Sequence, residues 1–186
     1  MNPLLSVIIP AFNEEKAIET IISKISNLPI DKEIIVVNDC SKDRTESILK
    51  SISFNNLKVI HHISNRGKLA ALFTGIENST GEFIFIQDVN AQYGINDYAK
   101  LLEAIKQTGA DMVLGSRFTK TSWSNICLNI LYGIKLKDWF TRCQLLRRES
   151  LLKLLPELKS SNIAFEILTK AIKKKMCVIE VSVSHD

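Results

Sequence analysis

The chain has 186 residues and a mass of 21.0 kDa, a size that suits a single domain of ordinary dimensions. Hydrophobic residues make up 46% and charged residues 24%, which excludes disordered, collagen-like and low-complexity chains. A net charge of +4 is too small to indicate a nucleic-acid partner. The apolar runs are much shorter than the roughly 18–20 residues that cross a bilayer.

Strand-like apolar runs alternate with helix-like segments as far as residue 114. Strands are predicted over residues 4–10, 33–38, 57–61, 83–87 and 111–114. Helical spacing of apolar residues predicts helices between them, over residues 14–28, 43–52, 68–78 and about 96–107. This alternation is typical of a parallel, doubly wound sheet flanked by helices, so the predicted fold class is α/β.

The pattern changes after residue 117. Residues 123–132 and 161–174 are predicted to form amphipathic helices, and residues 177–183 a late strand that joins the edge of the sheet. No linker rich in Pro, Gly or Ser interrupts the sequence. We therefore expect residues 1–186 to form one domain.

Cysteine spacing and local charge indicate where the protein works. The four cysteines are far apart and form no CxxC pair, which favours reduced thiols in the cytoplasm over a disulfide framework or a zinc site. Residues 135–175 carry 11 Lys or Arg against 4 Asp or Glu. This basic third suits phosphate groups or peripheral attachment to the cytoplasmic face of a membrane, with Trp123, Trp139 and Phe140 as interfacial anchors. The alternative is that these aromatic residues belong to the core.

Polar residues follow each of the first five predicted strands, at the edge where open parallel sheets bind ligands. Asp88, Asn90 and Gln92 offer oxygen ligands of the kind that Mg²⁺ and Mn²⁺ prefer, while Arg117 could neutralise phosphate. Neither GxGxxG nor GxxxxGK[ST] nor GxSxG occurs, which disfavours dinucleotide-binding, P-loop and serine-hydrolase functions.

Five motifs in order closely resemble those of the family 2 glycosyltransferases. They are SVIIPAFNE at residues 6–14, VNDCSKDRT at 37–45, NRGK at 65–68, QDVNAQ at 87–92 and GSRF at 115–118. Among these enzymes, the chain is most similar to polyprenyl-phosphate sugar transferases of the dolichol-phosphate mannose synthase type. The resemblance implies a GT-A fold, with residues 1–118 as the nucleotide-sugar-binding part and residues 119–186 as a shortened acceptor-side part.

The resemblance also implies roles for individual residues. The expected nucleotide contacts come from the first-strand motif and from the aspartate that recognises the base: Pro10, Phe12, Asn13, Glu14 and Asp39. The expected ligands of Mg²⁺ or Mn²⁺ are Asp88, Asn90 and Gln92, and the expected catalytic residues are Asp88, Asn90 and Arg117. The remaining candidates for substrate binding are Asn65, Lys68, Asp138 and Arg142.

The implied reaction transfers a hexose from a GDP- or UDP-sugar to a polyprenyl phosphate or another acceptor, with inversion at the anomeric carbon. Because an acceptor phosphate is already anionic, no strong general base is needed. The metal and an arginine would stabilise the departing diphosphate.

Several positions depart from the family pattern. Asn90 replaces an acidic metal ligand, which should weaken metal binding, and Cys40 stands where the family has glycine. Gln144 lies where an arginine for the acceptor phosphate is expected, and Arg142, Arg147 or Arg148 could substitute for it. Two alternatives stay open: a degenerate GT-A domain that binds nucleotide or a partner protein without turnover, and an unrelated α/β enzyme such as a nucleotidyltransferase.

Overall fold

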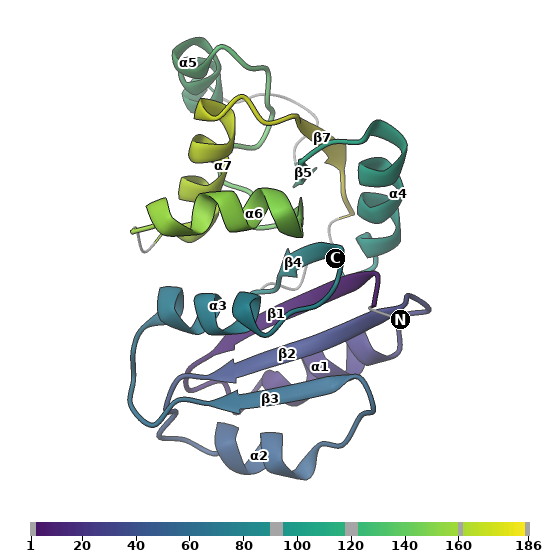
Figure 1. The fold of residues 1–186 in the computed structure, drawn as a ribbon, viewed down its shortest axis with the longest axis vertical. Helices are drawn as coiled ribbons and strands as arrows, with labels where there is room; N and C mark the ends of the chain where they lie inside the picture. The colour runs from purple at the N-terminus through teal and green to yellow at the C-terminus, as the bar shows by residue number, and fades with distance from the viewer. Residues whose placement is uncertain (1–2, 90–94, 118–122, 160–161, 185–186) are drawn as a thin grey trace.

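A computed structural model describes residues 3–89, 95–117, 123–159 and 162–184 of the chain. These residues form one seven-stranded sheet with helices on both faces, in the strand order β3-β2-β1-β4-β6-β5-β7 (Figure 1). The strands are β1 (Leu5–Ala11), β2 (Lys32–Asn38), β3 (Leu57–His61), β4 (Phe83–Ile86), β5 (Met112–Ser116), β6 (Gln144–Arg147) and β7 (Val178–Ser182).

Most of the helices form two layers, each packed on one face of the sheet. The helices are α1 (Ile18–Ser26), α2 (Thr45–Ser51), α3 (Lys68–Glu77), α4 (Tyr98–Thr108), α5 (Trp123–Tyr132), α6 (Arg148–Leu154) and α7 (Ile163–Lys173), with a short 3₁₀ helix over Leu155–Glu157. Buried side chains of α1, α2 and α4 share one hydrophobic cluster, and those of α3, α6 and α7 share a second. Figure 1 shows α3 on the near side of the sheet and α1 on the far side.

The central strand β1 explains why the sequence folds this way. All seven of its residues are buried, because the two helix layers cover both faces of the sheet. Val7 and Ile9 point into the cluster of α1 and α4, whereas Ile8 points into the cluster of α3 and α6. The continuous apolar run in the sequence is therefore a requirement of two-sided burial.

The predicted α/β class and the mostly parallel sheet are confirmed. β1 pairs in parallel with β2 and β4, and β7 joins the sheet edge beside β5, as expected. The antiparallel strand β6 between β4 and β5 was not predicted from the sequence. Its four residues are too few for a clear alternation, and they run directly into α6.

The helix expected from residue 14 begins four residues later, at Ile18. The backbone NH groups of Glu14 and Glu15 donate to Thr45, the first residue of α2, and to Asp43 just before it. The carboxyl ends of β1, β2, β3 and β4 lie at one edge of the sheet, since these strands are parallel. The loops that follow them are thereby brought together.

Candidate functional site

The loops that follow β1 and β2 are joined by a network of hydrogen bonds. Asn13 accepts from the backbone NH of Lys42 through Oδ1 at 2.8 Å, and its own NH donates to Ser41 Oγ at 3.0 Å. The NH of Glu14 donates to Thr45 Oγ1 at 2.8 Å. Asn13 has a left-handed φ of 57°, a conformation that asparagine adopts more readily than most residues. The network fixes the first-strand motif against the second.

Asp39 holds the next loop in place from a buried position at the end of β2. Its Oδ1 accepts from His62 Nδ1 at 2.7 Å and from the NH of Arg66 at 2.9 Å, and its Oδ2 accepts from the NH of Gly67 at 2.7 Å. Burial alone would raise the pKa of Asp39, but these three hydrogen bonds outweigh it and hold the pKa below its ordinary value. The ionised carboxylate makes the His62 Nδ1 a donor, and Nε2 of that ring lies 3.0 Å from Thr74 Oγ1.

A first cavity of about 400 Å³ opens between these loops. Ala11, Gly67 and Ala71 line it together with seven residues singled out in the sequence: Pro10, Phe12, Glu14, Asp39, Asn65, Lys68 and Asp88. The structure therefore brings most of the predicted nucleotide-binding residues to one place. Asn13 is not among the lining residues, and its side chain instead accepts from the backbone NH of Lys42 in the loop after β2.

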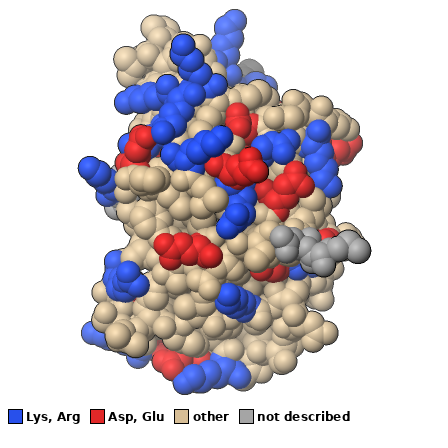
Figure 2. Space-filling view, viewed as in Figure 1, with Lys and Arg blue, Asp and Glu red and all other residues tan. Residues whose placement is uncertain are grey.

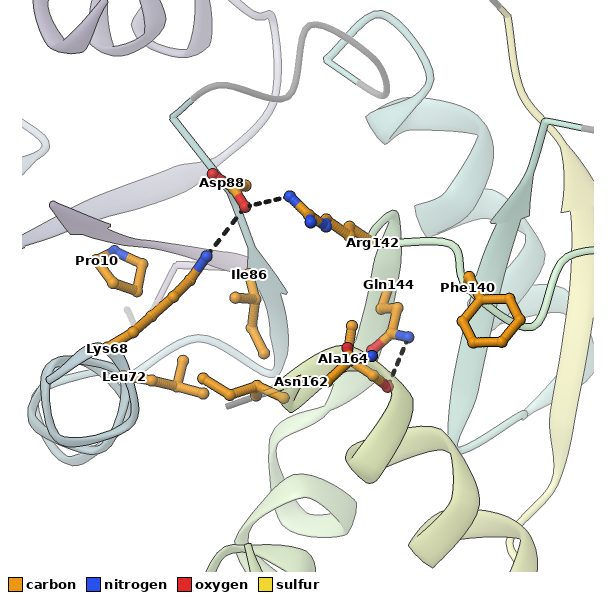
Figure 3. Close-up of a pocket in the computed structure, with 11 residues that line it drawn as sticks. Pro10, Lys68, Leu72, Ile86, Asp88, Phe140, Arg142, Gln144, Asn162 and Ala164 are labelled. Atoms are coloured by element: carbon orange, nitrogen blue, oxygen red, sulfur yellow. Dashed lines mark hydrogen bonds and ion pairs between the residues drawn. The ribbon is translucent and has the colours of Figure 1, made fainter. Parts of the chain in front are cut away.

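A second cavity of about 380 Å³ adjoins the first (Figure 3). It shares three lining residues with the first cavity, which are Pro10, Lys68 and Asp88. Its remaining wall combines apolar and polar side chains from β4, α3 and the segments around β6 and α7: Leu72, Ile86, Phe140, Arg142, Gln144, Asn162, Ile163 and Ala164. The two cavities thus meet at a carboxylate and a lysine.

Asp88 lies at this junction between two cations. Its Oδ2 is 3.0 Å from Lys68 Nζ and 3.0 Å from Arg142 Nη1 (Figure 3). The backbone at Asp88 is held by the buried side chain of Gln87, whose Nε2 donates to the carbonyl oxygen of Asp88 at 2.8 Å. Gln87 in turn accepts from the buried Tyr98 hydroxyl at 2.7 Å. Sequence reasoning quoted Gln87 within a motif but did not identify this supporting role.

The structure separates the three arginines considered for an acceptor phosphate. Arg142 lines the second cavity, whereas Arg147 Nε donates to the carbonyl oxygen of Ala110 and Arg148 Nε to Ser79 Oγ, at the opposite edge of the sheet. Gln144 also lines the second cavity, and its amide donates to the carbonyl oxygen of Ala164 at 3.0 Å. Arg142 is therefore the arginine that reaches this cavity.

Other predicted residues lie elsewhere. Arg117 and the buried Asp138 form an ion pair with each other and are not among the residues that line the two cavities. Asn90 and Gln92 lie outside the described residues. The expectation that Trp139 is an interfacial anchor was wrong: the side chain is fully buried, its ring packs against Tyr132, and its Nε1 donates to Asn129.

The Asp88 carboxylate at the junction could supply part of the ligand set of a divalent metal ion. Among the described residues, no three His, Cys, Asp or Glu side chains gather into a metal-binding group. Mg²⁺ in particular is commonly held by only one or two carboxylates together with phosphate oxygens of a substrate. Asp88 can supply such a carboxylate, and the first cavity leaves room beside it for a substrate phosphate.

No helix in the described ranges is long and apolar enough to cross a membrane.

The sheet and the site at its carboxyl edge define a GT-A domain, and solved structures agree. A mannosyltransferase from Pyrobaculum calidifontis, solved with GDP-Man and Mn²⁺, matches 100% of this chain and 57% of its own, with a TM-score of 0.75 and 20% identity. S. aureus TarS, solved with UDP-GlcNAc, matches 98% of this chain and 59% of its own, with a TM-score of 0.71 and 20% identity. At this identity the likeness shows the fold.

Residues 6–154 match Glycosyl transferase family 2, and the chain belongs to that family. The bactoprenol glucosyl transferase of Shigella phage SfX is 36% identical over 124 residues, 63% of this chain and 40% of that protein. The dolichol-phosphate mannosyltransferase of Pyrococcus furiosus is 35% identical over 119 residues, 62% of this chain and 34% of that protein. The matched region thus spans less than half the length of these relatives.

Proposed function

We propose that this domain transfers a hexose from a GDP- or UDP-sugar to a polyprenyl phosphate, with inversion at the anomeric carbon. The observation that carries the proposal is the position of Asp88, at the junction of two adjoining cavities with different walls. One cavity is lined by the family motifs, and the other by an arginine and apolar side chains. A donor in the first and an acceptor in the second would meet beside this carboxylate.

In the donor half, the first cavity would hold the nucleotide diphosphate. Phe12 lines it with a half-exposed ring that a base could stack on, and Lys68 offers a cation for the diphosphate. Asp39 has both oxygens occupied by His62 and by the loop that precedes α3. Asp39 would therefore contribute mainly by holding in place the loop that forms part of the cavity wall. Direct contact between Asp39 and the base stays a prediction.

In the acceptor half, the second cavity would hold the lipid phosphate and the first carbons of its chain. Arg142 supplies a guanidinium that can pair with phosphate, and Leu72, Ile86 and Ile163 supply an apolar wall. An oxygen of the acceptor phosphate would form the new bond to the anomeric carbon. The bond from that carbon to the donor diphosphate would break, and GDP or UDP would leave with the electron pair. The catalytic role of Arg117 stays a prediction.

Asp88, with Asn90 and Gln92 expected beside it, would hold Mg²⁺ or Mn²⁺ together with the donor diphosphate. Bound there, the cation supplies a positive charge against the charge that develops on the leaving diphosphate. Lys68 and Arg142 now share Asp88 Oδ2, so they would become available to phosphate groups as a cation takes their place. Because the proposed acceptor is a membrane lipid, the domain would work as a peripheral protein at the cytoplasmic face of a membrane.

Isothermal titration of GDP and UDP, each with and without Mn²⁺, tests the donor half. We expect one nucleotide to bind with a Kd that Mn²⁺ lowers at least about tenfold, since the cation bridges carboxylate and diphosphate. Asp88→Asn should abolish the effect of Mn²⁺, and the exposed Glu77→Gln should leave it unchanged. Incubation of GDP-mannose, UDP-glucose or UDP-GlcNAc with a short polyprenyl phosphate then tests transfer. Failure of both nucleotides to bind would refute the proposal.

A second candidate function is nucleotide binding without turnover, which the neutral residue Asn90 favours. Loss of one negative charge beside a divalent cation should weaken metal binding. Asn90→Asp distinguishes the two candidates. If the natural chain transfers sugar at a rate within about tenfold of the variant, it is a working enzyme; if only the variant is active, the natural domain is degenerate.

A further inference from the structure

Helix α5 carries its apolar side chains on the outside. Trp123, Ile126, Cys127, Ile130 and Leu131 follow one another at positions i, i+3, i+4, i+7 and i+8, which is the spacing of a single helix face. In most surface helices this face is buried, but here it is open: Trp123 is 83% exposed, Ile130 78% and Leu131 74%. We call these five residues the apolar stripe.

The opposite face of α5 holds asparagines that attach the helix to the domain. Asn125 is buried, and its amide donates to the carbonyl oxygen of Lys137. Asn129 accepts from the backbone NH of Leu136 at 2.9 Å and from Trp139 Nε1 at 2.7 Å, and it donates to the Leu136 carbonyl oxygen at 2.9 Å. These hydrogen bonds fix the rotation of the helix about its axis. The apolar stripe is therefore held outward by specific contacts.

The charge around the stripe indicates what covers it. Residues 123–137 contain two lysines, Lys135 and Lys137, both exposed, and no acidic residue. Glu180 of β7 lies beside both lysines, and its carboxylate accepts from the backbone NH of Lys137 at 3.0 Å. Three more exposed lysines follow α7 directly or end it, at residues 173–175. Figure 2 shows Lys and Arg gathered at the upper end of the molecule, where Figure 1 places α5 and α7. Such a basic rim complements an anionic surface.

We propose that the apolar stripe of α5 inserts into the headgroup region of an anionic lipid bilayer, with Lys135 and Lys137 on the lipid phosphates. An apolar helix face with basic residues beside it is the pattern of an interfacial helix. A second copy of the chain is a poorer occupant, because two rims of the same sign would face each other across a symmetric contact. The choice of a bilayer also rests on the proposed function, whose acceptor is a membrane lipid.

The chain connects the stripe to the second cavity. From the end of α5, the chain runs through Leu136 and Trp139 in the core to Phe140 and Arg142, which line the second cavity. Phe140 is half exposed and stacks on Phe165 of α7, with ring centroids 5.4 Å apart. The segment between α5 and β6 therefore joins the apolar stripe to the cavity proposed for the acceptor phosphate.

Flotation with vesicles of phosphatidylglycerol and phosphatidylcholine tests the proposal on the full chain. We expect flotation with these vesicles, weaker flotation with phosphatidylcholine alone, and about a tenfold or larger loss of binding for Ile130→Glu, since a charged group would enter the apolar stripe. Leu152→Glu, on the exposed side of α6, is the matched control and should float like the natural chain. Circular dichroism of each variant establishes that it is folded.

Cysteine alkylation gives a second readout that needs no substitution. Cys127 lies in the stripe and Cys177 precedes β7, and both are exposed. Vesicles should slow the alkylation of Cys127 by iodoacetamide several-fold and leave Cys177 unchanged. Emission from Trp123 should shift to shorter wavelength on the same vesicles, whereas the other tryptophan, Trp139, is already buried.

Each outcome decides the proposal separately from the proposed function. Equal flotation of the natural chain and Ile130→Glu, or equal alkylation of Cys127 with and without vesicles, would overturn membrane docking. A dimer in solution that Ile130→Glu dissolves would assign the stripe to a second copy instead. If the natural chain binds vesicles but transfers no sugar to a short polyprenyl phosphate, docking stands and the proposed function fails. If Ile130→Glu transfers sugar but neither protein floats with the vesicles, the proposed function stands and membrane docking fails.

Discussion

Arg117 donates through Nε and Nη2 to the two carboxylate oxygens of Asp138, at 2.8 and 3.1 Å. The backbone of Asp138 is fixed as well, because its NH donates to Glu180 of β7 at 2.9 Å. The carboxylate is almost wholly buried, whereas about a quarter of the arginine side chain is exposed. The pair ties the end of β5 to the segment that leads into β6, and so supports the wall of the second cavity from outside it.

Removal of Asp138 should therefore destabilise the domain. Asp138→Ala leaves a partly buried guanidinium without its carboxylate, and breaking such a pair typically costs about 3–5 kcal/mol. Urea unfolding followed by circular dichroism measures the loss. Arg117→Ala should cost a comparable amount, and the double variant should cost less than the sum of the two. An additive double variant would show that the two residues do not act as a pair.

Cys40 is held in a backbone conformation that glycine adopts more easily. Its φ is 59°, in the left-handed region, where a side chain costs roughly 1–2 kcal/mol. Cys40→Gly relieves this strain, and Cys40→Ala loses the same thiol but keeps the Cβ atom. We expect the glycine variant to be more stable than the alanine variant by about 1 kcal/mol in urea unfolding. Equal stabilities would mean that the surrounding loops accommodate the conformation without strain.

Asp39 should make stability depend on acid pH. Its pKa is lower in the folded chain than in the unfolded chain, so it contributes stability above the unfolded value that is lost as pH falls through the folded value. The difference in unfolding free energy between the natural chain and Asp39→Asn should thus be largest near neutral pH. Below about pH 4 it should shrink, as protons bind the carboxylate.

The control for this pH dependence is Glu77→Gln, which also replaces a carboxylate by an amide but at an exposed position on α3. Its difference in stability from the natural chain should be small and should not follow the acid titration of Asp39. Urea unfolding at several pH values from about 3 to 7 measures both variants. A difference for Asp39→Asn that stays constant over this whole range would contradict the ionised state assigned to the carboxylate.

The parts of the fold set by local periodicity could be predicted from the sequence. β1 is a run of apolar residues because both faces of it are buried, and β3 and α5 have the predicted bounds. β6 could not be predicted, because its place depends on antiparallel pairing with β4 and β5 rather than on its own four residues. Tryptophan suits both a core and a membrane interface, so the burial of Trp139 and the exposure of Trp123 were not distinguishable from spacing.

For the candidate site, the order of the motifs along the chain predicted which residues gather in one place. It did not predict the contacts that these residues make. The carboxyl ends of parallel strands meet, so Asp39, Lys68 and Asp88 line one cavity. The sequence did not indicate that His62 and two backbone NH groups occupy the Asp39 oxygens. It left three arginines open for the acceptor phosphate, because which end of a short strand faces a cavity depends on its direction. β6 runs antiparallel, so Arg142 before it faces the site.

The position of Arg142 predicts a selective kinetic effect. Arg142→Ala removes a guanidinium from the second cavity, so the KM for a short polyprenyl phosphate should rise about tenfold or more, while the Kd for the nucleotide changes little. Arg148→Ala removes the same charge from the far edge of the sheet and should leave both constants near their natural values. Steady-state kinetics with varied acceptor, together with nucleotide titration, measures the two effects. If Arg148→Ala raised the acceptor KM and Arg142→Ala did not, the acceptor phosphate would have to bind elsewhere than in the second cavity.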